Sequence, residues 1–130
     1  MDRRGYQQYK AQSVNSMTPG ELLVLLCDEL VKRGTLASIA LDKEDYPTFE
    51  KAMDRCIDIV KYLDETLDRS YEISRQLSPL YEFFTYDLLQ VKLHRKKDEL
   101  ERLRPMLADL RDAFKEAERN NAAAGKQGQA

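Results

Sequence analysis

The chain has 130 residues and a mass of 15.1 kDa, a length typical of one domain with one hydrophobic core. Its formal net charge of -2 and isoelectric point of about 5.5 argue against nucleic-acid binding, because neutralising phosphates takes a surplus of Lys and Arg. The sequence has neither the ~20 consecutive apolar residues of a spanning helix nor an N-terminal apolar run like that of a signal peptide, so we expect a cytoplasmic protein without membrane insertion.

Residues 1–17 form an N-terminal arm with no regular apolar pattern, although the arm carries Tyr6, Tyr9 and Val14. The first predicted helix follows at "MTPGEL", where Thr18 and Glu21 have the spacing of a capping box and Pro19 suits the first turn. Apolar or small residues then recur on one stripe: Leu23, Leu26, Cys27, Leu30, Gly34, Ala37 and Leu41. The pattern predicts a helix over 19–41.

Two further helices are predicted over 47–68 and 71–93. The stripe of the second is Phe49, Ala52, Met53, Cys56, Ile59, Val60, Leu63 and Leu67, and that of the third is Ile73, Leu77, Leu80, Tyr81, Phe84, Leu88 and Val91. Pro79 interrupts the third, so that helix is either kinked near Arg75 or begins afresh with Ser78 as its cap. We favour the kink.

The fourth predicted helix, over 97–118, has the most regular stripe: Leu100, Leu103, Leu107, Leu110, Phe114 and Ala117. Pro105 lies off this stripe and should bend the helix without exposing the core. After Arg119 the periodicity is lost, so residues 120–130 are predicted to be a flexible tail.

Four amphipathic helices with short connections predict an all-α fold, an antiparallel up-down-up-down four-helix bundle over 18–119. A three-helix core with a detached hairpin is the alternative. Cys27 and Cys56 are expected to be small core hydrophobes rather than a disulfide. The predicted core includes Leu26, Leu30, Cys56, Val60, Leu63, Phe84, Leu88, Leu103, Leu107 and Leu110.

No catalytic or cofactor motif is recognisable, so neither an enzyme nor a cofactor is expected. A di-iron centre in a bundle uses Glu-x-x-His pairs, and Val91 stands where the glutamate would precede His94, the single histidine. The basic cluster Lys92, Arg95, Lys96 and Lys97 has two interpretations, a solvated turn or a contact with an acidic partner, and we favour the turn.

Apolar residues outnumber the places on the core stripes. The first helix adds Val24, Leu25 and Val31, and the third adds Phe83 and Tyr86. A wide core stripe with a few exposed hydrophobes accounts for this excess, and so does a groove for an amphipathic partner helix. The residue pattern alone does not decide between these two explanations.

Several segments together resemble the bacterial flagellin export chaperones, the FliS family. They are the arm with Tyr6 and Tyr9, "QSVNSMTPGELLVLLCDEL", "KAMDRCIDIVKYLDETLD", "LSPLYEFFTYDLL" and "LADLRDAFKEA". The chain departs from the family pattern at Cys27, "QVKLH", Pro79, Pro105 and Phe114, which are positions of packing more than of surface chemistry.

The resemblance implies a cytoplasmic chaperone that binds the disordered C-terminal segment of flagellin, prevents early polymerisation and delivers the subunit for type III export, and we expect a one-to-one complex. Export-gate components or a regulatory protein are further candidate partners. A generic helical adaptor, or another type III secretion chaperone, is the alternative. The candidate partner-binding residues are Tyr6, Tyr9, Val14, Leu25, Ile57, Tyr81 and Phe83. The arm is expected either to cover part of the partner surface in the free protein or to clasp one end of the core permanently.

Overall fold

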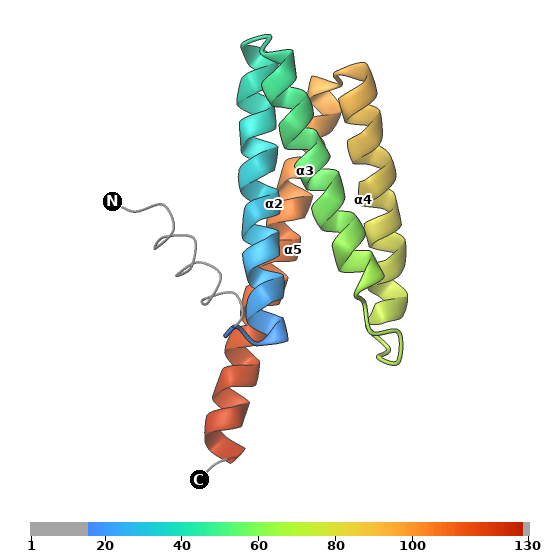
Figure 1. The fold of residues 1–130 in the computed structure, drawn as a ribbon. Coiled ribbons are helices and arrows are strands. Elements are labelled where there is room, and N and C mark those ends of the chain that lie inside the picture. The colour runs from blue at the N-terminus through green and yellow to red at the C-terminus, as the bar shows by residue number, and fades with distance from the viewer. Residues whose placement is uncertain (1–15, 129–130) are drawn as a thin grey trace, which may run out of the picture.

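The computed structural model describes residues 16–128, with side chains described as far as residue 123. This part of the chain forms four helices, α2 (Pro19–Asp42), α3 (Tyr46–Glu65), α4 (Ser74–His94) and α5 (Lys97–Gly128). They run alternately up and down (Figure 1). The predicted all-α, up-down-up-down four-helix bundle is therefore confirmed, whereas the arm's Tyr6, Tyr9 and Val14 lie outside the described residues.

The capping predicted at the start of α2 is present. The Glu21 amide donates to Thr18 Oγ1 over 3.1 Å, and the Thr18 hydroxyl lies 3.1 Å from Glu21 Oε1. This arrangement satisfies one of the amide groups that a helix start leaves without a partner. A second contact joins Thr18 to Glu118 of α5 over 3.4 Å, so the start of α2 lies beside the late part of α5.

The connection between α2 and α3 is a tight turn. Glu44 takes a left-handed conformation with φ of 57°, and the Asp45 carboxylate caps α3 by accepting from the Thr48 amide over 3.3 Å. A connection this short forces the two helices to run antiparallel.

α4 runs unbroken through Pro79, so the helix does not begin afresh at Ser78. The Ser78 hydroxyl instead belongs to a polar cluster that joins α3, the connecting loop and α4. Arg69 donates to Ser78 Oγ over 3.1 Å and also pairs with Asp64 over 3.3 Å. This cluster fixes the start of α4 against the end of α3.

α5 continues to Gly128, ten residues beyond the predicted end of the helix at residue 118. Asn120 to Ala123 are exposed, so these four residues add no apolar stripe to the core. Alanine has the highest intrinsic helix propensity, however, so the alanines after Asn121 can prolong a helix that is already nucleated.

The core closely follows the predicted stripes. Of the ten predicted core residues, Leu26 is half-buried against the core and the other nine are buried. Cys27 and Cys56 are both buried and free, which confirms their prediction as core hydrophobes. Burial raises the pKa of each thiol to about 12, so neither is a reactive thiolate near neutral pH.

Candidate partner-binding surface

The four helices do not close evenly around the core. α2 packs along both α3 and α5, and α3 packs along α4, whereas α4 and α5 have only a small mutual contact. Figure 1 shows α5 leaving α4 at their connecting turn and passing beside α2 toward the other end of the bundle. The side of the core between α4 and α5 is therefore the least covered by helix.

One polar pair marks which sides of α4 and α5 face each other. Partial burial and a hydrogen bond with Glu99 of α5 raise the pKa of Asp87 of α4. Leu80 and Phe83 precede Asp87 by seven and four residues, so they share its side of α4. Met106 and Phe114 follow Glu99 by seven and fifteen residues, so they lie on the same side of α5 as Glu99.

These four residues, Leu80, Phe83, Met106 and Phe114, are called the α4–α5 face below. Phe83 is 43% exposed and Met106 is 38% exposed, while Leu80 and Phe114 are half-buried against the core. The Phe83 ring also packs on Phe84, with ring centroids 5.8 Å apart. The α4–α5 face thus offers apolar contact area that continues directly into the core.

A second apolar surface lies between the start of α2 and the late part of α5. This α2–α5 groove has a volume of about 610 Å3, and its apolar lining comes from Met17, Val24, Leu25 and Ala122. An ion pair between Lys115 and Asp28, 3.3 Å apart, crosses its edge. Because the groove reaches Met17, it lies where the arm joins the bundle.

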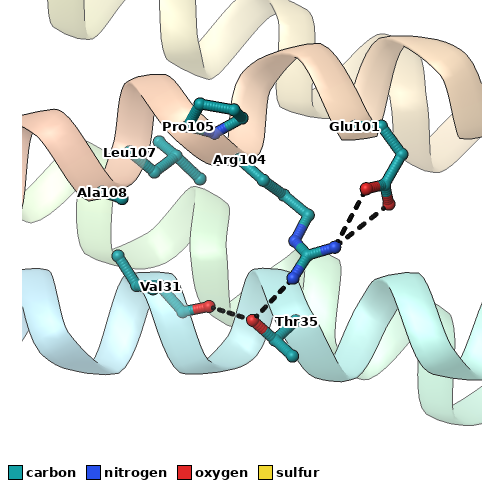
Figure 2. A pocket seen from close by; sticks show the side chains of 7 residues that line it. All are labelled: Val31, Thr35, Glu101, Arg104, Pro105, Leu107 and Ala108. Atoms are coloured by element: carbon teal, nitrogen blue, oxygen red, sulfur yellow. Dashed lines mark hydrogen bonds and ion pairs between the residues drawn. The ribbon is translucent and has the colours of Figure 1, made fainter.

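A smaller pocket of about 280 Å3 lies further along the same two helices (Figure 2). Val31, Leu107 and Ala108 form its apolar side, and Arg104 closes it by donating to Thr35 Oγ1 over 3.1 Å and to Glu101 Oε2 over 3.0 Å. With its guanidinium already engaged by these two side chains, Arg104 joins α5 to α2. We therefore assign the pocket a structural role.

The predicted partner-binding residues fall in different places. Leu25 is 40% exposed and lines the α2–α5 groove, and Phe83 lies on the α4–α5 face. Ile57 and Tyr81 are 7% and 1% exposed, so in the free protein neither offers apolar surface to a partner. Both lie in the core, Ile57 on α3 and Tyr81 on α4.

Sequence reasoning missed Met106, and it placed Leu80 among core residues. Met106 is an apolar residue that lies off the leucine stripe of α5. That position is the sequence signal that would have predicted its exposure. Leu80 has the spacing of a core residue and is half-buried against the core, as that spacing predicts, while part of it remains open beside α5.

Three cations of the basic cluster have partners inside the bundle. Lys92 pairs with Asp54 over 2.7 Å, the Arg95 guanidinium stacks 3.5 Å from the centre of the Tyr46 ring, and Lys97 pairs with Asp42 over 2.9 Å. These contacts favour a structural role in the turn over a contact with an acidic partner. His94 is exposed in the last turn of α4.

Among the described residues, no group of three His, Cys, Asp or Glu side chains is placed to hold a metal ion. None of the helices in this part of the chain has the length and apolar character needed to cross a membrane.

Comparison with known proteins identifies the family. The family model described as flagellar protein FliS matches residues 2–121. A flagellar secretion chaperone FliS of Bacillus subtilis (strain 168) is 30% identical over 112 residues, which cover 86% of this chain and 84% of the relative. Both matches confirm the resemblance inferred from the sequence, and the chain belongs to the FliS family of flagellar secretion chaperones.

Proposed function

We propose that this chain is a cytoplasmic flagellar export chaperone that binds the disordered C-terminal segment of flagellin, one segment to each chaperone. By covering that segment it prevents early polymerisation and holds the subunit ready for type III export. Family membership supports the export role, and the relative from Bacillus subtilis is described as a secretion chaperone.

The observation that carries the binding proposal is the apolar area left open between α4 and α5. A disordered segment loses conformational entropy when it folds on a partner, so it needs a long apolar surface in compensation. The α4–α5 face and the α2–α5 groove supply such area on two sides of α5. The bound segment gains helix because helical backbone satisfies its own polar groups against an apolar surface.

Isothermal titration calorimetry with a synthetic flagellin C-terminal segment tests this proposal. Apolar burial contributes ~25 cal/mol per Å2, so we expect a negative heat-capacity change and little dependence on salt. Binding that collapses between low and moderate salt keeps the partner but rejects the apolar mechanism. Absence of binding to folded protein rejects the function.

The arm enters the proposal as a cover for part of this surface in the free protein. Met17, the last residue of the arm, lines the α2–α5 groove, which supports that groove as the surface covered by Tyr6, Tyr9 and Val14. The competing possibility is a permanent clasp. Amide exchange that is as slow in the arm as in the helices, and unchanged by flagellin, identifies the clasp.

A generic helical adaptor or another type III secretion chaperone is the alternative function. A protein with that function would have the same four-helix fold but would not bind flagellin, so a pull-down with flagellin distinguishes the two functions. Export-gate components and a regulatory protein remain proposed partners.

A further inference from the structure

A third groove, between α3 and α4, is not used by the proposed flagellin surface. Its volume is about 580 Å3, and its lining includes Lys61, Asp64 and Glu65 of α3 and Glu82, Tyr86 and Leu89 of α4. Leu89 is nine residues from Leu80, which places the two side chains on opposite sides of α4 at 100° per residue. The α3–α4 groove and the α4–α5 face therefore lie on adjacent sides of the same helix, with Tyr86 of the groove about 60° from Phe83 of the face.

The apolar lining residues Tyr86 and Leu89 continue beyond the groove, through Leu93, as one helical strip along α4. Tyr86, Leu89 and Leu93 have spacings of three and four residues, and they are 65%, 39% and 59% exposed. A strip of this kind matches the apolar stripe of a second helix lying along α4. The distance along α4 from Glu82, at the acidic end, to Leu93, at the apolar end, is ~16 Å, or about three helical turns.

The charged part of the groove is acidic and incompletely paired. Asp64 is engaged by Arg69 over 3.3 Å, and Lys61 is the one cation among the lining residues. Glu65 and Glu82 have no ion-pair or hydrogen-bond partner within the described part of the chain. Two unpaired carboxylates at one end of an apolar strip favour a ligand with cations at the matching end.

We propose that the α3–α4 groove docks an amphipathic helix of a second protein, whose apolar stripe covers Tyr86, Leu89 and Leu93. Lys or Arg side chains at one end of that helix pair with Glu65 and Glu82. Apolar burial supplies the affinity, and the charge pairs fix the direction in which the helix lies along α4. The chaperone can then hold flagellin and this second partner at the same time.

The test uses the full chain and a fluorescently labelled synthetic peptide of about three helical turns, with leucines on one face and two lysines at one end. Amide shifts on the isotope-labelled chain should change over residues 61–65 and 82–93. Shifts spread over α2 and α5, or binding that does not saturate, overturn the proposal.

A matched pair of variants separates specific pairing from general attraction to an acidic protein. Glu65→Gln with Glu82→Gln should weaken peptide binding roughly three- to tenfold, and added salt should reduce this difference. Asp109→Asn with Glu116→Gln makes the same charge change at exposed positions of α5 and should stay within about twofold of the wild type. Equal weakening in both variants overturns the proposal.

The same variants, titrated with the flagellin segment, distinguish this inference from the proposed function. Flagellin affinity should be unchanged by Glu65→Gln with Glu82→Gln. A parallel loss of flagellin binding assigns the groove to flagellin and overturns a separate partner. Failure of the wild type to bind flagellin, with peptide binding intact, rejects only the flagellin function.

Discussion

The Lys97 ammonium of α5 donates to both oxygens of Ser38 on α2, over 2.6 Å to the side-chain hydroxyl and 2.9 Å to the backbone carbonyl. Ser38 is 5% exposed, and its hydroxyl donates to Glu101 over 2.5 Å. These bonds join α5 to α2 near the α4–α5 turn. They fix α5 to α2 rather than to α4, which leaves the α4–α5 face uncovered.

The first prediction concerns this linkage. Lys97→Met keeps the length of the side chain but removes the charge, and it leaves the buried Ser38 carbonyl without that donor. Hydrogen bonds to charged groups contribute about 1.5–3 kcal/mol, so we expect a loss of that order in the free energy of unfolding, measured in urea. Lys96→Met at the exposed neighbour is the control, and an equal loss there contradicts the assigned role.

The second prediction is a pH dependence centred on Glu101. The hydrogen bond from Ser38, followed by the charges of Arg104 and Lys97, lowers the pKa of Glu101 below its ordinary 4.5. A lowered pKa means that the folded state favours the carboxylate, so this contribution is present above pH 4.5 and is lost as pH falls through the folded-state pKa.

Glu101→Gln should therefore reduce stability at neutral pH, and the difference from the wild type should shrink as the solution is acidified. Urea unfolding at about pH 7, 5 and 3 measures it. If Glu116→Gln, at an exposed position of the same helix, flattens the pH profile as much, the Ser38 network is not its source.

The third prediction tests the core. Leu107 is 1% exposed, so Leu107→Ala should lower the free energy of unfolding by ~2–5 kcal/mol, through lost transfer energy and a residual cavity. Leu93 is 59% exposed and gives the matched control, for which Leu93→Ala should cost roughly 0.5 kcal/mol or less. A cost this small for Leu107→Ala means that Leu107 is not part of the core.

The sequence was sufficient to predict the helices and most of the core, because each buried stripe repeats at helical spacing and the starts of α2 and α3 carry capping residues. The candidate site was harder to predict. Tyr81 lies on a predicted core stripe and was still a candidate for partner binding, whereas Ile57 lies off its stripe, and only the packing of the helices shows that it is buried. The exposure of Met106 and Leu80 depends on how far α4 and α5 diverge, and the periodicity of each helix does not predict that divergence.

The fourth prediction concerns the arm. Tyr9→Asp should weaken flagellin binding without much loss of bundle stability, because an arm residue contributes little to a core formed by residues 27–110. Calorimetry and urea unfolding of the same variant measure the two effects. Lowered stability with unchanged affinity favours the permanent clasp over the cover.

The last prediction concerns the α4–α5 face itself. Phe83→Asp places a carboxylate in apolar contact area, and burying that charge without a partner is unfavourable, so affinity for the flagellin segment should fall at least about tenfold. Phe83 is 43% exposed, so the new carboxylate keeps access to water in the free protein, and urea unfolding of the variant measures what the lost packing on Phe84 costs.

Two further aspartate variants locate the flagellin surface. Leu25→Asp makes the same change in the α2–α5 groove, and Tyr86→Asp makes it in the α3–α4 groove. If flagellin covers both sides of α5, the Phe83 and Leu25 variants lose affinity while the Tyr86 variant does not. Loss with Phe83→Asp alone confines the segment to the α4–α5 face. Full affinity in both the Phe83 and Leu25 variants means that flagellin binds elsewhere, because neither apolar surface then contributes to the complex.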